Sequence, residues 1–319
     1  MNGPNNKESN NKEPINQESG NHKASRPADS GKLLLFIIVA VLFASLIALA
    51  GSQSGARTTL GGVSIPVFAL CAIIAFALNW LIFIPSYLAQ TEHYFDLTGS
   101  LTFVTVILTA LALSPEQDWR AAILAVLVCI WATRLGGFLF MRVRKDGSDG
   151  RFDTIKPHFT RFLLTWTLQA VWVFVSSAAA LAAITTLRRV EIDTIAIIGL
   201  IMWLTGFTIE VVADAQKRAF RADAANEGQF ISSGLWAWSR HPNYFGEILL
   251  WIGIAVIALP ALSGWQLVAL ISPVFITLLI TRVSGIPMLE ARAAKRWGDD
   301  PAWQAYTGRT SRLIPRPPR

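Results

Sequence analysis

The chain has 319 residues, of which 53% are apolar and only 15% are charged, and its formal net charge is +7. A soluble domain carries about 25% charged residues, so the composition excludes an ordinary soluble globule and indicates a membrane protein. The two cysteines, Cys71 and Cys129, both stand in apolar runs, so neither a disulfide framework nor a cysteine metal site is implied.

The first 32 residues differ from the rest of the chain. They are rich in Asn, Ser, Lys and Glu and contain almost nothing apolar. A segment of this composition cannot bury enough surface to offset its chain entropy. We therefore predict that residues 1–32 form a disordered tail.

Eight apolar segments follow, and most approach the roughly 20 residues that a helix needs to cross a hydrocarbon layer. They span residues 33–50, 63–89, 100–114, 120–140, 161–187, 195–213, 245–260 and 264–284. The third segment is short. The predicted fold class is therefore an all-α, polytopic transmembrane helix bundle of about 7–8 spans.

The basic residues of the loops indicate the orientation. With eight spans, 23 of the 28 Lys and Arg residues fall on the side of the two termini, 4 fall on the other side, and Arg134 lies inside a span. Basic loops remain in the cytoplasm, so we expect both termini to face the cytoplasm. Topology accounts for the positive net charge, and nucleic-acid binding is not expected.

Arg134 lies within the fourth apolar segment, where lipid penalises a charge that is neither paired nor in contact with water. One interpretation is an arginine that extends its head group toward the interface from near a helix end. However, Arg142 and Arg144 already mark that end. We therefore expect Arg134 to face an internal polar cavity.

A polar strip closes the sixth segment. Its members, at spacings of four, four and three residues, share one helix face and are Glu210, Asp214, Arg218 and Arg221. One interpretation is a self-satisfied ladder of ion pairs. The other is a cavity wall, in which the arginines bind phosphates and the carboxylates accept hydrogen bonds from ribose or amide groups.

Residues 239–247, Ser-Arg-His-Pro-Asn-Tyr-Phe-Gly-Glu, stand at the start of the seventh segment. The proline suits the first turn of a helix, which places Asn243 and Glu247 on one face, and a helix N-terminus favours anions. A capped helix with interfacial aromatic anchors would explain the aromatic residues. It does not explain why Arg240, His241, Asn243 and Glu247 occur together.

These features resemble a known family. The residues from Glu210 to Arg221, the triplet Gly-Leu-Trp at 234–236, the 239–247 run and Trp303 to Tyr306 are similar to the C-terminal domain of the membrane steroid 5-alpha-reductases. The resemblance is closer to the bacterial DUF1295 branch, strong over residues 195–319 and weaker around Arg134. Isoprenylcysteine carboxyl methyltransferases and sterol C14 reductases carry runs similar to Arg-His-Pro-Asn-Tyr-Phe-Gly.

The resemblance implies an NADPH-dependent oxidoreductase that reduces a conjugated carbon–carbon double bond in a hydrophobic lipid or steroid-like substrate. It implies a substrate side over residues 33–190 and a cofactor side over residues 191–319. By position, the resemblance implies cofactor contacts at Asp214, Arg218, Arg221, Asn243 and Glu247. From the residue pattern we add Glu210, Arg240 and His241 to this candidate set.

The substrate side departs from the family pattern. Reductases that act on steroids carry a tyrosine where this chain has Trp131, and the indole N–H of Trp131 is a far weaker acid. The candidate catalytic residues are therefore Arg134, which would polarise the substrate or balance charge, and Tyr94 and Tyr244 as proton donors. Glu290 and Arg292, beyond the last span, are further candidates for the site.

Two other functions stay open: a membrane methyltransferase that uses S-adenosylmethionine, and a non-enzymatic transporter or scaffold. A transporter would more naturally show repeated halves, and the chain shows none. The expected partners are a hydrophobic small molecule from the bilayer and membrane lipids. The expected location is the bacterial inner membrane, and no metal is required.

Overall fold

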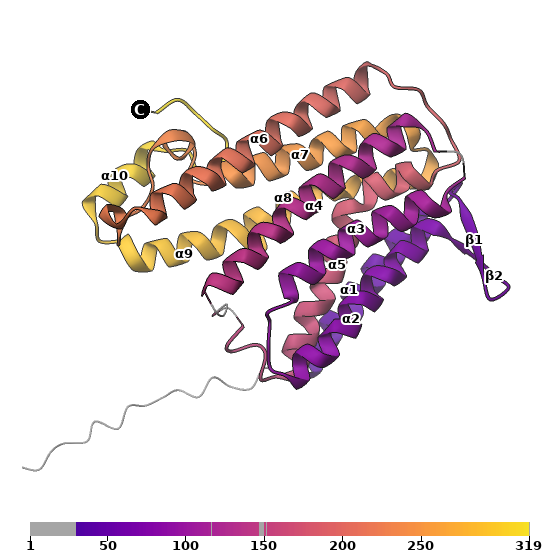
Figure 1. Ribbon diagram of the computed structural model, residues 1–319, viewed down its shortest axis with the longest axis horizontal. Coiled ribbons are helices and arrows are strands. Elements are labelled where there is room, and N and C mark those ends of the chain that lie inside the picture. Colours follow the sequence, from indigo (N-terminus) through magenta and orange to yellow (C-terminus); the bar gives the residue numbers. More distant parts are fainter. Residues whose placement is uncertain (1–29, 116, 147–149, 151, 319) are drawn as a thin grey trace, which may run out of the picture.

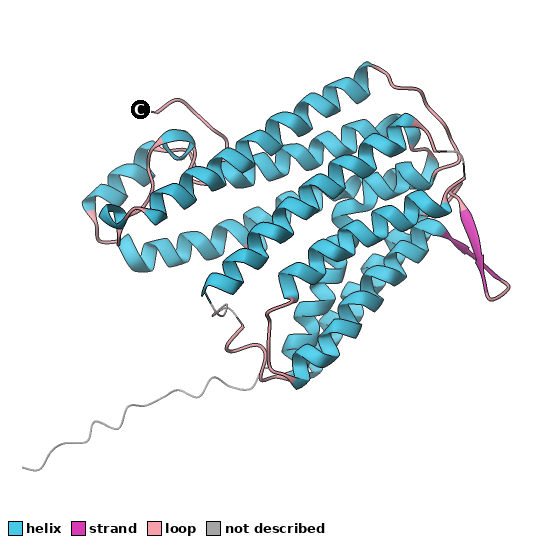
Figure 2. Ribbon diagram, in the orientation of Figure 1, coloured by secondary structure: helices cyan, strands magenta, loops and turns pink. Residues whose placement is uncertain are grey.

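The computed structural model describes residues 30–318, except 116, 147–149 and 151. Of the predicted disordered tail, residues 1–29 lie outside the described residues, whereas residues 30–32 form the first turn of α1 (Ser30–Gly51). In the described part, helices dominate, and one short hairpin supplies the strands (Figure 2). Eight of its helical segments are long and apolar enough to cross a membrane. The predicted all-α transmembrane bundle is thus confirmed.

The first half of the bundle contains four long helices and the hairpin. The helices are α1 (Ser30–Gly51), α2 (Val67–Leu88), α3 (Phe95–Leu113) and α4 (Trp119–Asp146). The antiparallel strands β1 (Arg57–Leu60) and β2 (Val63–Pro66) join α1 to α2. Gly61 and Gly62 form the hairpin turn with positive φ angles of 57° and 82°, a conformation that glycine adopts without steric cost.

The second half is built from longer and more broken elements. Its helices are α5 (Phe159–Thr185), α6 (Thr194–Ala222), α7 (Pro242–Ala258), α8 (Ile271–Leu278), α9 (Gly285–Trp297) and α10 (Pro301–Arg309). Short 3-10 turns cover Ala224–Asn226, Gly234–Ala237, Leu259–Ala261 and Gly264–Leu270. A π-helical turn, Leu279–Val283, separates α8 from α9.

Several boundaries differ from the sequence prediction, and three of these differences are large enough to matter for the spans. The second span begins at Val67 rather than at residue 63, because residues 63–66 belong to the hairpin. The third begins at Phe95 rather than at residue 100 and has 19 residues, so it is long enough to span. The sixth runs on to Ala222 rather than ending at residue 213, so the polar strip continues the helix.

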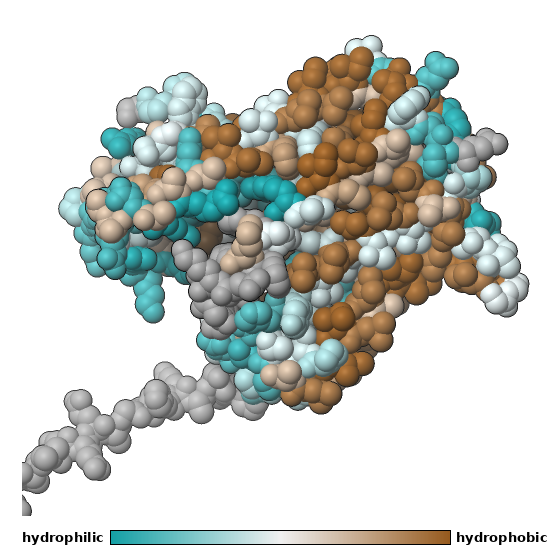
Figure 3. Space-filling model, viewed as in Figure 1, coloured by the Kyte–Doolittle hydropathy of each residue, from teal (hydrophilic) through white to brown (hydrophobic). Residues whose placement is uncertain are grey.

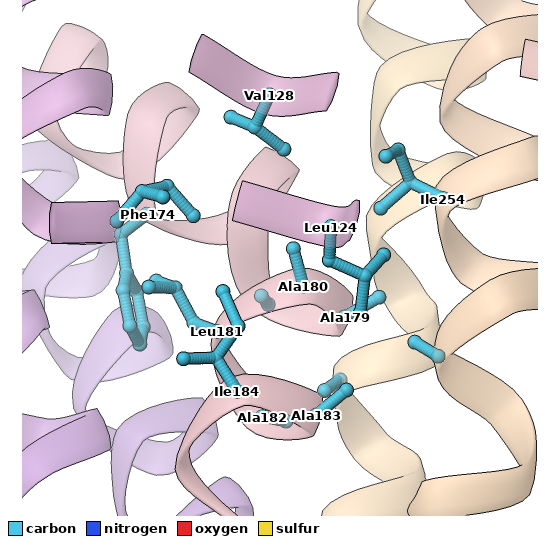
Figure 4. Packing of buried hydrophobic residues seen from close by; sticks show 14 of the residues in the cluster. Leu124, Val128, Phe174, Ala179, Ala180, Leu181, Ala182, Ala183, Ile184 and Ile254 are labelled. Atoms are coloured by element: carbon cyan, nitrogen blue, oxygen red, sulfur yellow. The ribbon is translucent and has the colours of Figure 1, made fainter. Parts of the chain in front are cut away.

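Helix α5 forms the centre of the bundle and contacts α1, α2, α3, α4, α7 and α8. Its second half, from Val173 to Ile184, is almost completely buried. Alanines at 178–180 and 182–183 let neighbouring helices approach closely, and Leu124, Val128 and Ile254 pack around them (Figure 4). One apolar helix thus supplies the common packing surface of the bundle.

Helix α7 lies beside α6 (Figure 1), and glycines form the contact. A Cβ added at Gly206 would lie 2.5 Å from the carbonyl oxygen of Gly246, and one at Gly253 would lie 2.6 Å from that of Gly199. The two backbones therefore touch. This close approach sets Glu210 of α6 beside the first turns of α7, since a Cβ at Gly246 would lie 2.7 Å from its backbone nitrogen.

The hairpin and helices α9 and α10 lie at opposite ends of the bundle, which we name the hairpin end and the α10 end (Figure 1). Apolar side chains cover the middle of the bundle, and hydrophilic ones gather around α9 and α10 (Figure 3). At the hairpin end, the buried Arg120 donates hydrogen bonds to the carbonyl oxygens of Ile257 and Glu191, each at 2.6 Å, and pairs with Asp193 at 3.2 Å. Arg120 thereby joins the start of α4 to the end of α7 and to the loop between α5 and α6.

Candidate functional site

The expected polar cavity residue Arg134 is the centre of a buried network on three helices. Its two terminal nitrogens form ion pairs with Glu210 and Asp214 of α6. The indole Nε1 of Trp131 donates to Glu210 Oε2 at 3.2 Å, and Asn243 Nδ2 of α7 donates to Asp214 Oδ1 at 3.2 Å. We name these five residues the acid–arginine cluster. It binds α4, α6 and α7 to one another inside a membrane span.

Local helix geometry brings the cluster together. Glu210 and Asp214 are four residues apart and Trp131 and Arg134 three apart, so each pair lies on one helix face. Asn243 stands in the first turn of α7, which Pro242 opens. The glycine contact between α6 and α7 then sets these faces against each other.

Glu247 lies one turn beyond Asn243 on α7 and is half-buried. It is close enough to interact electrostatically with Glu210, Asp214 and Arg134. No hydrogen bond joins it to another described side chain. The site therefore gathers three carboxylates around one guanidinium, an arrangement that favours a ligand group able to donate hydrogen bonds, such as a hydroxyl or a carboxamide.

A cavity of about 280 Å³ lies at the α10 end, between α6, the loop before α7, α9 and α10. Its cationic lining residues are Lys217, Arg221, Arg240, Arg292 and Arg296. Its aromatic lining residues are Phe220, Phe230, Trp236, Trp297, Trp303 and Tyr306. We name it the basic cavity. Cations beside ring faces suit an anionic ligand that carries an aromatic group.

His241 and Arg240 connect the basic cavity to the acid–arginine cluster along the chain. Glu290 of α9 accepts from both, at 2.8 Å from His241 Nε2 and 3.0 Å from Arg240 Nη1. Burial lowers the pKa of His241, although the hydrogen bond to Glu290 acts in the opposite direction. The imidazole is thus neutral at pH 7. Among the described residues, none is a hydrogen-bond partner of its buried Nδ1 or of the buried Nε of Arg240.

The walls of the basic cavity are held by polar tips on aromatic side chains. The Tyr306 hydroxyl donates to the Trp236 carbonyl at 2.7 Å, and Trp297 Nε1 donates to the Gly228 carbonyl at 2.7 Å. The Nζ of Lys217 lies 4.5 Å from the ring centroid of Trp236. Burial raises the pKa of Tyr306, so this phenol remains protonated and serves as a hydrogen-bond donor to the wall.

The candidate cofactor residues fall into two groups. Glu210, Asp214 and Asn243 belong to the acid–arginine cluster, with Glu247 beside it. Arg221, Arg240 and His241 line the basic cavity. The structure therefore brings seven of the eight candidates to two adjoining places on α6 and α7.

Arg218 is the remaining candidate: it is exposed and does not line the basic cavity, whereas Lys217 does. Helix geometry alone indicates that Lys217, rather than Arg218, faces the cavity. At 100° per residue, Lys217 lies about 20° from Glu210 around the helix, and Arg218 lies about 80° from it. The seven-residue spacing from Glu210 to Lys217 therefore identifies the cavity-lining cation, whereas the preference for an arginine at 218 does not.

The two tyrosines proposed as proton donors lie at different places. Tyr94 is 54% exposed and borders a separate groove between α2 and α3. Tyr244 lies beside His241, with ring centroids 5.9 Å apart, and its ring is close to Gly285 at the start of α9.

The fold and the site define an integral-membrane helical protein with a buried ion-pair network that adjoins a basic, aromatic cavity. Residues 82–310 match the family described as Protein of unknown function (DUF1295). The chain belongs to the DUF1295 family. No curated protein and no solved structure matches it. The matched residues include both the acid–arginine cluster and the basic cavity, whereas α1 and the hairpin lie outside them.

Proposed function

We propose that this protein is a membrane-embedded oxidoreductase that binds NADPH and reduces a conjugated carbon–carbon double bond in a hydrophobic, lipid-derived substrate. The observation that supports it best is the adjacency of the basic cavity and the acid–arginine cluster on α6 and α7. A dinucleotide has chemistry for both: phosphates and an adenine at one end, and ribose hydroxyls and a carboxamide at the other.

The basic cavity fits the adenosine and phosphate end. Lys217, Arg221 and Arg240 offer charge-assisted donors to phosphate oxygens, and the ring faces of Phe230 and Trp297 suit stacking with a base. The buried Nε of Arg240 supports the fit, because a donor without a partner in a buried place favours a ligand that satisfies it.

The acid–arginine cluster fits the nicotinamide end. Asn243 Oδ1 is buried and has no hydrogen-bond partner in the part of the chain that the structure describes. It is an acceptor, as are the carboxylates of Asp214 and Glu247. Ribose hydroxyls and a carboxamide supply the matching donors. Arg134 already binds two carboxylates, so its role is to hold them in place and to balance their charge. Bound there, the cofactor supplies the hydride.

Trp131 does not provide the proton for this reaction in our account. Its indole N–H points to Glu210, and an indole is a very weak acid. The proton that completes the reduction is assigned to Tyr244, which lies beside His241. The hydrophobic substrate would approach from the membrane, where the protein surface over the spans is apolar (Figure 3). We expect the protein to act at the cytoplasmic side of a bacterial inner membrane, because basic residues favour the cytoplasmic side and Lys217, Arg221, Arg240, Arg292 and Arg296 gather at the α10 end.

Substitution of Asn243 by alanine or Glu247 by glutamine tests the assignment. Asn243→Ala removes the amide acceptor, and Glu247→Gln removes the charge and replaces one acceptor oxygen with an NH2 donor. Loss of a single hydrogen bond of this kind costs about 1–3 kcal/mol, so NADPH affinity is expected to fall by roughly 5-fold to 150-fold. Binding is measured by titration of the purified protein, and stability by thermal unfolding without ligand.

The matched control is Glu191→Gln, which removes an exposed carboxylate at the hairpin end and should leave NADPH affinity unchanged. Wild-type NADPH affinity in both test variants would exclude these residues from the cofactor site. Unfolding of both variants before any ligand is added would show that the residues serve only to stabilise the bundle.

A further inference from the structure

Among the described residues that line the basic cavity, Glu290 is the one acid. Its carboxylate lies among the basic side chains of the cavity and contacts two of them. One carboxylate oxygen lies 2.8 Å from His241 Nε2 and the other lies 3.0 Å from Arg240 Nη1. The Glu290 side chain is 25% exposed, so one side of this contact remains open to the cavity.

A carboxylate that binds two donors with two oxygens presents the same chemistry as two oxygens of a phosphate group. Arg240 and His241 also stand three and two residues before Asn243, the member of the acid–arginine cluster at the start of α7. A phosphate group that approached these donors would meet the Glu290 carboxylate already in place. Anion binding and the Glu290 contact therefore compete for the same donors.

The helix that carries Glu290 is attached through an irregular junction. The π-helical turn Leu279–Val283 interrupts the last span, and Ser284 follows it before α9 begins. Such turns break the regular hydrogen-bond ladder of a helix and are frequent at functional sites. At its other end α9 is held by the hydrogen bond from Trp297 to the Gly228 carbonyl. The contact of Glu290 lies between these two points.

We propose that Glu290 is an internal competitor for the anion site: it holds Arg240 and His241 when no ligand is bound, and a phosphate group of the ligand displaces it. With the proposed function, that ligand is NADPH, and the inference rests on this function only for the identity of the ligand. The competition lowers the affinity for every anion and favours ligands that make additional contacts with Lys217, Arg221, Arg292 or Arg296.

The test is the affinity of the wild-type protein and of two variants for inorganic pyrophosphate and for NADPH. Glu290→Gln keeps the shape and removes the charge, and it is expected to bind both anions on the order of tenfold more tightly, the effect of one charge-assisted contact. Glu227→Gln is the matched control, because it removes an exposed carboxylate near the same cavity and should change affinity less than about twofold.

The outcomes separate the two proposals. Tighter pyrophosphate binding by Glu290→Gln without any NADPH binding would support the competitor and overturn the proposed function. Equal NADPH affinity of the Glu290→Gln and Glu227→Gln variants would overturn the competitor alone. Absence of binding of either anion to every variant would overturn both. Should Glu290→Gln not fold, Glu290→Asp carries the test: one methylene shorter, it is expected to tighten binding to a smaller degree.

Discussion

Replacement of Arg134 by glutamine will destabilise the protein by about 3–5 kcal/mol, the usual cost of removing one partner from a buried ion pair. Glu210 and Asp214 both depend on this guanidinium, and only 5% and 12% of their side chains are exposed. Without it, two carboxylates would remain inside a membrane span with Trp131 and Asn243 as their described donors. Thermal or denaturant unfolding in detergent measures the change.

The triple variant Arg134→Gln, Glu210→Gln, Asp214→Asn tests whether the stranded carboxylates cause this loss of stability. It removes the stranded charges and is expected to recover most of the lost stability, because neutral amides can hydrogen-bond to one another. Arg188→Gln, an exposed arginine at the hairpin end, should change stability by no more than about 0.5 kcal/mol. An Arg134→Gln variant as stable as Arg188→Gln would show that the network does not stabilise the bundle.

The second large effect is expected at Gly206. A Cβ there would lie 2.5 Å from the Gly246 carbonyl oxygen and 2.6 Å from the Leu250 backbone nitrogen. The obstacle is backbone, which cannot rotate away, so Gly206→Ala must separate α6 from α7 at a cost of about 1–3 kcal/mol. Since the same contact positions Glu210 and Asn243, NADPH binding should weaken as well.

Gly137→Ala provides the comparison, because a Cβ at this helical glycine meets nothing within 4 Å. Alanine is favoured over glycine inside a helix by roughly 0.5–1 kcal/mol, so this variant should be neutral or slightly stabilised. Unfolding curves for the two alanine variants, measured side by side, decide the point. Equal stability of the two would mean that the α6–α7 backbone contact is not close enough to constrain the helices.

Much of the fold follows from patterns that are local in the sequence. Apolar runs of spanning length predict the eight spans directly. The sequence predicts that residues 63–66 belong to the second span, because Val-Ser-Ile-Pro is as apolar as the end of a transmembrane helix. Only the pairing of β1 with β2 removes them from the helix, and pairing depends on a contact between segments that periodicity does not report.

In the candidate site, too, some features follow from local sequence patterns and others depend on contacts between distant segments. The sequence predicts that Arg134 faces an internal polar cavity; it forms two ion pairs with Glu210 and Asp214 and is not among the residues that line the basic cavity. The donation from Trp131 to Glu210 links residues 79 positions apart and has no local signal. The position of Glu290 is similar: it depends on the path of the chain through the π-helical turn, which the sequence pattern of α9 alone does not determine.

The most direct measurement of the central claim is the thermal stability of the wild-type protein in detergent with NADPH, NADH or S-adenosylmethionine. A ligand that binds only the folded state, at 100 times its Kd, stabilises that state by about 2.7 kcal/mol. We predict that NADPH raises the unfolding temperature and that S-adenosylmethionine does not. Stabilisation by S-adenosylmethionine alone, or by none of the three, would contradict the assignment of the basic cavity and the acid–arginine cluster to a nicotinamide dinucleotide.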